Sequence, residues 1–121
     1  MHNPDFMLIY VADPSRSRRF YAELFERDPV EESPNFAMFA LDSGLKFGMW
    51  SREEVEPAPT TVPGASELLF SVDNVETLES THHEWSRRGL VIAQQPKRMD
   101  FGHTFVALDP DGHRLLVIAP E

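Results

Sequence analysis

Glu67 and the histidines are the side chains of this sequence whose chemistry suits acid–base catalysis or metal binding. The chain has five histidines and no cysteine, so thiolate catalysis, disulfides and cysteine-ligated metal sites are excluded. His82 and His83 are neighbours on a predicted helix, where adjacent residues do not share a face, and we expect both to be solvated. Glu67 lies in the otherwise apolar run ELLFSV, and His103 lies in the aromatic segment 101–105. An enzyme without a metal needs a general base, and Glu67 with His103 is the one plausible pair.

Charge and hydropathy restrict the partners of the protein. The 121 residues carry a formal net charge of −9, with an isoelectric point of about 4.9. This negative field repels nucleic acid phosphates and anionic membrane surfaces, so we expect neither as a partner. No apolar run approaches the roughly 20 residues of a membrane-spanning helix, and the first residues lack the basic-then-apolar order of a signal peptide. We therefore expect a single cytoplasmic domain over residues 1–121.

The first half of the sequence predicts one helix placed between short strands. The run FMLIYV, residues 6–11, is β-branched and aromatic, which is typical of a strand. Asp13 and Pro14 suit the N-cap and the first position of a helix, and aromatic residues at helical spacing continue it until Pro29. Three more strands are predicted at residues 29–32, 36–41 and 45–50.

The second half repeats this order after a connector, residues 53–65, that is rich in glutamate and proline. A strand at 67–72 precedes a helix at 75–88 that is capped by Gly89. Three short strands follow at residues 90–93, 104–108 and 114–118. The duplication predicts an α+β fold of two βαβββ modules, residues 1–52 and 66–121, whose half-sheets share one concave surface.

Short motifs near both ends of the chain carry a family resemblance. The stretch FVALDPDGH, residues 105–113, and the opening VAD followed by SRRFY, within residues 11–21, resemble the glyoxalase/bleomycin resistance/dioxygenase (vicinal oxygen chelate) superfamily. Together with the duplication, the resemblance covers nearly the whole chain. Within that superfamily, the segments FGMWS at 47–51 and DFGHTF at 100–105 are similar to metal-free phenazine-antibiotic-resistance proteins that bind their drug.

The resemblance implies paired modules that form an incomplete barrel around a cleft, and it implies a homodimer. Metal enzymes of this superfamily place histidine, glutamine or glutamate at four equivalent strand positions, which are Phe6, Gly48, Glu67 and Leu116 in this sequence. Only Glu67 among them offers a donor atom, whereas a transition metal needs three or more protein donors in such sites. We therefore expect no metal and no other cofactor, and no metal-dependent lyase or dioxygenase chemistry.

Without metal ligands, the implied cleft becomes an apolar wall for a flat molecule. Side chains alternate along a strand, so Phe6 brings Tyr10 to the cleft and Gly48 brings Trp50. Aromatic ligands gain by offset stacking on such rings, and a glycine leaves room for a ring to approach. The pattern leaves open which face of strand 36–41 lines the cleft. The predicted ligand-binding residues are Phe6, Tyr10, Phe39, Gly48, Trp50, Glu67, Phe101, His103 and Leu116.

These residues favour a protein that sequesters a planar aromatic, antibiotic-like small molecule, with a phenazine-type ligand preferred. Lys46 or Arg114 is then a candidate partner for a ligand carboxylate. Two alternatives stay open. One is a metal-independent enzyme of the same fold that uses Glu67 and His103, which product formation over many turnovers would reveal. The other is a non-catalytic interaction module whose cleft holds a protein segment.

Overall fold

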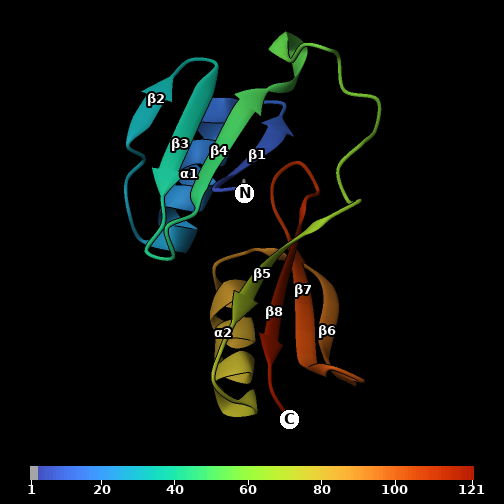
Figure 1. Ribbon diagram of the computed structural model, residues 1–121. Helices are drawn as coiled ribbons and strands as arrows, with labels where there is room; N and C mark the ends of the chain where they lie inside the picture. The colour runs from blue at the N-terminus through green and yellow to red at the C-terminus, as the bar shows by residue number, and fades with distance from the viewer. Residues whose placement is uncertain (1–2) are drawn as a thin grey trace. The chain divides into compact units, whose positions relative to one another are not determined.

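A computed structural model describes residues 3–121, in which the chain divides into two compact units. The first unit ends at Thr61 and the second begins at Val62. Each unit runs strand, helix and then three strands, and each forms its own four-stranded mixed sheet (Figure 1). The predicted α+β fold of two βαβββ modules is therefore confirmed. A single 3₁₀ turn, η1 (Arg52–Glu54), follows the last strand of the first unit.

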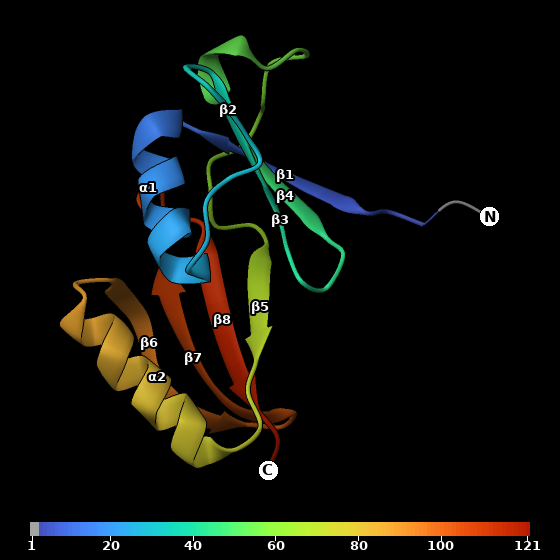
Figure 2. The same ribbon diagram turned by 90° about the vertical axis from the view of Figure 1, so that its left-hand side faces the viewer.

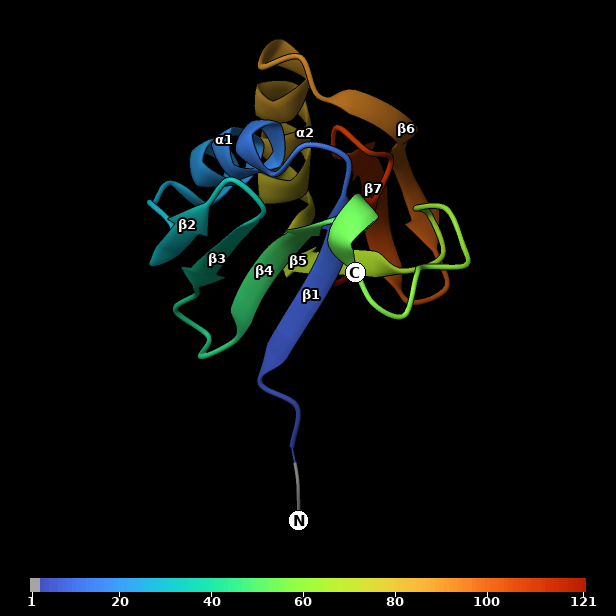
Figure 3. The same ribbon diagram turned by 90° about the horizontal axis from the view of Figure 1, so that it is seen from above.

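The first unit packs one helix against one face of its sheet (Figure 2). Its strands lie in the order β1-β4-β3-β2 (Figure 3), and β1 is parallel to β4. Tyr21 and Phe25 of the helix contact Phe47 and Phe39 of the sheet, with ring centroids 4.9 Å and 5.3 Å apart. Burial of these large apolar rings makes this face the core of the unit. The elements are β1 (Phe6–Val11), α1 (Pro14–Phe25), β2 (Glu31–Ser33), β3 (Phe36–Ala40) and β4 (Lys46–Ser51).

Helix α1 begins where the sequence predicts and ends earlier. Asp13 is the N-cap, and its Oδ1 accepts hydrogen bonds from the backbone N–H groups of Ser15 and Arg16 at 3.1 Å and 3.3 Å. The helix was expected to run until Pro29, but Glu26 adopts a left-handed conformation with φ of 53°. Its backbone N–H bonds to the carbonyl of Ala22 and closes the last turn, so the helix ends at Phe25.

The second unit repeats the arrangement with the strand order β5-β8-β7-β6, and β5 is parallel to β8 (Figure 2). Trp85 of its helix lies against Phe70 and Phe105 of the sheet, with centroids 5.4 Å and 5.5 Å apart. His82 was expected to be solvated, but its ring also lies against Phe105, and its Nε2 is buried without a hydrogen-bond partner among the described residues. The elements are β5 (Glu67–Ser71), α2 (Val75–Arg87), β6 (Val91–Met99), β7 (Gly102–Leu108) and β8 (Arg114–Ala119).

Strand β6 is much longer than the strand expected at residues 90–93. Pairing with β7 continues to Met99 through register shifts between Ile92 and Gln94 and between Gln94 and Lys97. Bulges of this kind, on a strand at the sheet edge, accommodate Pro96, which has no backbone donor for the ladder. Across residues 3–121, neither helix is long and apolar enough to cross a membrane.

Candidate ligand-binding site

The face of the first sheet that is turned away from α1 is rich in aromatic side chains, and we call it the aromatic face. Phe39 and Phe47 face α1, so the residues that alternate with them on β3 and β4 point the other way. Strand register arranges these residues in rows. The rows are Phe6, Lys46 and Ala40; then Leu8, Gly48 and Met38; then Tyr10, Trp50 and Phe36.

Gly48 has no side chain, and the Phe6 ring occupies the space above it on the aromatic face. A Cβ atom at this position would lie 2.9 Å from Cε1 of Phe6 and 3.2 Å from Cδ1 of Leu8. The space above Gly48 is therefore filled by Phe6, whereas the sequence suggested that it would be left for a ligand ring. Phe6 stays 40% exposed, so its ring is accessible to a ligand.

Phe39 does not belong to the aromatic face, although it was predicted to bind the ligand. Its side chain is 0% exposed and its ring contacts Phe25 of α1, which places it in the core. Phe36 and Met38 take its place on the aromatic face, where they are register partners of Trp50 and Gly48. The sequence left both undecided, because large apolar residues stand at odd and even positions of the run FAMFA and alternation cannot choose between them.

In the second unit, the face turned away from α2 is aliphatic and carries one ion pair. Phe105 faces α2, so Leu116 and its register partner Leu69 lie on the opposite face, and Leu69 is 56% exposed. Glu67 and Arg114 are also register partners, and Oε2 of Glu67 lies 2.8 Å from Nη2 of Arg114. The carboxylate on an apolar strand is thus explained by the arginine beside it.

Phe101 lies at the tip of the β6–β7 hairpin and is 60% exposed. It borders a hollow of about 220 Å³ at the end of the sheet that holds Ser71 and Ile118. The other residues around this hollow are Val72 and Pro120. The hollow is largely apolar, with Ser71 as its polar residue.

Glu67 and His103 are not brought together. His103 is the register partner of Ala119 and lies two residues before Phe105 on β7, so its side chain is on the same α2 side of the sheet. Glu67 is instead the register partner of Arg114. On β8, Arg114 lies five residues before Ala119, the partner of His103, which is roughly 17 Å along the strand. The geometry of the second unit therefore gives no support to an acid–base pair formed by these two residues.

Comparison with known proteins places the chain in a family. The model of the Glyoxalase/Bleomycin resistance protein/Dioxygenase superfamily matches residues 3–117. The chain belongs to this superfamily. It is 31% identical over 117 residues to the phenazine antibiotic resistance protein EhpR of Enterobacter agglomerans, covering 94% of this chain and 89% of that protein.

Solved structures share the fold of this chain. The solution NMR structure of an Agrobacterium tumefaciens protein is 45% identical, with a TM-score of 0.92 over 100% of this chain and 99% of that one. A glyoxalase-related enzyme from Fulvimarina pelagi shares 22% identity and a TM-score of 0.83, covering 98% of this chain and 88% of that one. At that identity the likeness concerns the fold alone.

The positions that hold a metal in superfamily enzymes do not suit one in this chain. Phe6 and Gly48 offer no donor atom, and in the second unit Leu116 offers none beside the carboxylate of Glu67. That carboxylate is already paired with Arg114. One engaged carboxylate falls short of the three or more protein donors that a divalent transition metal requires.

A second group of donor atoms has a structural role in the superfamily's DPDGH motif. Donor atoms of Asp109, Asp111 and His113 lie within 4.8 Å of one another. Oδ1 of Asp109 accepts hydrogen bonds from the backbone N–H groups of Asp111 and His113 at 2.9 Å and 2.8 Å. The buried carboxylate therefore fastens the turn between β7 and β8, which accounts for an aspartate at this point of the motif.

Proposed function

We propose that this protein binds and sequesters a planar aromatic small molecule, with a phenazine-type compound preferred, and that it does so without a metal and without turnover. The observation that carries the proposal is the aromatic face of the first unit. Tyr10, Trp50 and Phe36 form one row on it, and Phe6 extends over Gly48. The likeness to a phenazine antibiotic resistance protein supports the choice of ligand class.

Binding follows from the physical properties of these side chains. A flat ligand that covers the aromatic face removes apolar surface from water, at roughly 25 cal/mol for each Å². Offset stacking on each ring adds about 0.5–1.5 kcal/mol beyond the burial of area. Sequestration needs this affinity and an adequate concentration of protein, and it needs no group that moves a proton.

The proposed ligand-binding residues of the first unit are Phe6, Tyr10 and Trp50, with Phe36 and Met38 added by strand register and Gly48 as support for Phe6. In the second unit, Leu116, on the face turned away from α2 and only 7% exposed, and Phe101, at the hollow, remain proposed contacts. We also propose a homodimer, as the superfamily resemblance implies.

A tryptophan-fluorescence titration with phenazine tests the proposal. Trp50 lies on the aromatic face, whereas Trp85 is 8% exposed and packs between Phe70 and Phe105. We expect saturable quenching near one phenazine per chain, loss of quenching in Trp50→Ala, and full quenching in the control Trp85→Phe. Mass spectrometry after long incubation should recover the phenazine unchanged.

Two titration results would contradict the proposal. One is the absence of saturable quenching by phenazine and by other planar aromatic antibiotics. The other is quenching that persists in Trp50→Ala and disappears in Trp85→Phe, because the ligand would then lie away from the aromatic face. Accumulation of a product in proportion to time would replace sequestration by catalysis.

A further inference from the structure

We infer that the ligand of the aromatic face is a planar aromatic acid, and that Lys46 selects its negative charge. This inference rests on the proposed function, because it concerns the same site. It rests on two observations. Lys46 lies beside Phe6, and Arg114, the other cation considered for a ligand carboxylate, is already paired with Glu67.

Strand register places Lys46 at the edge of the aromatic face. It is the partner of Phe6 on β1 and of Ala40 on β3, and it lies two residues before Gly48 on β4. Adjacent strands are about 4.8 Å apart, so Lys46 begins one strand spacing from Phe6. Its backbone N–H donates to the carbonyl of Asp5 at 3.0 Å, which holds this end of β4 against β1.

The charge of Lys46 is available to a ligand. Its side chain is exposed, and within residues 3–121 no carboxylate lies at ion-pair distance from it. The neighbours in its row are a phenylalanine and an alanine, which offer no competing charge. The ammonium group is therefore the cation that a molecule stacked on Phe6 would meet.

Arg114, which the sequence makes an equal candidate for a ligand carboxylate, already has a carboxylate partner within the chain. Nη2 of Arg114 lies 2.8 Å from Oε2 of Glu67, so its charge is already balanced. A ligand anion would have to displace a carboxylate that is held in register on the neighbouring strand. This contrast makes Lys46 the stronger partner of the two.

The remaining charge on the aromatic face lies farther from Phe6. Glu31 of β2 is the register partner of Met38, so two strands separate it from β1 across the sheet. A ring stacked on Phe6 therefore has Lys46, one strand spacing away, closer than Glu31, three strand spacings away. Because the whole chain carries a net charge of −9, a preference for an anion must come from such a local contact.

The test compares phenazine with a phenazine that carries one ring carboxylate, in the wild type, in Lys46→Met and in the control Lys97→Met. Lys97 is an exposed lysine of the second unit, so its substitution changes the net charge equally. We expect the wild type to prefer the carboxylate by about two- to fivefold, the scale of one exposed ion pair. Lys46→Met should abolish this preference by weakening binding of the carboxylate, and Lys97→Met should retain the preference.

The outcomes separate the two proposals. If the wild type binds both probes equally, if Lys46→Met keeps the preference, or if Lys97→Met removes it as fully as Lys46→Met, the inference fails while the proposed function stands. If neither probe binds the wild type, the proposed function fails and the inference fails with it.

Discussion

At the scale of single residues, two glycines should respond very differently to the addition of one methyl group. At Gly48, the obstacle to a Cβ is the far end of the Phe6 ring, 2.9 Å away, and that ring is 40% exposed and free to turn. We expect Gly48→Ala to change the free energy of unfolding by less than about 1 kcal/mol. Urea denaturation of the purified variant measures the change.

Gly102→Ala is the matched contrast. A Cβ at Gly102 would lie 2.4 Å from the carbonyl oxygen of Ala119, and φ at this glycine is +138°. Neither the backbone of β8 nor this conformation accommodates a side chain, so we expect a loss of at least about 2 kcal/mol. Equal stability losses in the two variants would contradict the assigned positions of Phe6 and Ala119.

Residue-level prediction from the sequence succeeded where residue type alone decides the environment. Asp13 had to cap a helix, and Phe6, Gly48 and Trp50 had to share one face, because alternation follows from strand geometry. Phe39 was misplaced because the run FAMFA is apolar on both faces, so only pairing with β4 reveals its direction. The partner of Glu67 likewise depends on which residue of β8 lies opposite it.

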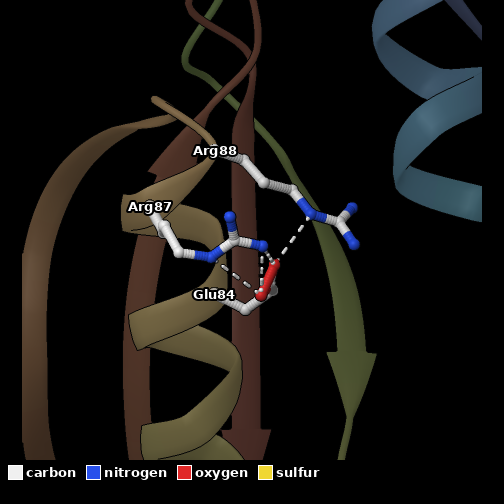
Figure 4. Close-up of polar contacts among 3 residues, drawn as sticks. All are labelled: Glu84, Arg87 and Arg88. Carbon is white, nitrogen blue, oxygen red and sulfur yellow. Dashed lines mark hydrogen bonds and ion pairs between the residues drawn. The ribbon is translucent and has the colours of Figure 1, made fainter.

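At the scale of elements, the C-terminal turn of α2 contains a cluster whose charge depends on pH. Glu84 accepts hydrogen bonds from Arg87 and Arg88, and its Oε2 lies 3.2 Å from Nε of Arg88 (Figure 4). The hydrogen bond from Arg87, supported by the one from Arg88, lowers the pKa of Glu84 below its ordinary value of 4.5. Cations at this end of the helix also interact favourably with its dipole.

The lowered pKa of Glu84 determines how its contribution to the free energy of unfolding changes with pH. A carboxyl with a lower pKa in the folded state adds stability above pH 4.5, and this contribution is lost as the pH falls through the folded-state value. We expect the stability difference between wild type and Glu84→Gln to shrink on acidification, as measured by urea denaturation at neutral pH and below pH 4.5. An NMR titration midpoint for Glu84 above 4.5 would contradict the mechanism.

The elements were predictable as far as local chemistry defines them. Both helices and most strands follow from periodicity and caps, whereas the end of α1 depends on Glu26 in a left-handed conformation that non-glycine residues seldom adopt. The length of β6 was not predicted, because a proline such as Pro96 usually ends a strand. Here the strand continues because β6 lies at the sheet edge and has bulges near Pro96. Such features arise from pairing between strands, which the sequence does not display.

At the scale of the whole molecule, the duplication was visible because it repeats turn residues as well as apolar runs. Gly44 and Gly112 both have positive φ and both lie in the turn before the last strand of their unit. A repeat of this kind predicts the order and pairing of strands within each module, and both sheets show the same order. Each module thereby has one sheet face that packs against its own helix, and the exposed apolar side chains of the other face bear on assembly.

We expect the protein to be a homodimer in solution. β1 is an edge strand of the first sheet and β5 an edge strand of the second. Large apolar side chains are exposed on both strands, including Phe6 at 40% and Leu69 at 56%. Exposed apolar surface and unpaired strand edges are features that self-association covers. Light scattering during gel filtration should give a molar mass twice the 13.8 kDa of the chain, decreasing only on strong dilution. A monomer mass at every concentration would contradict the dimer, and it would mean that the aromatic face binds its ligand within a single chain.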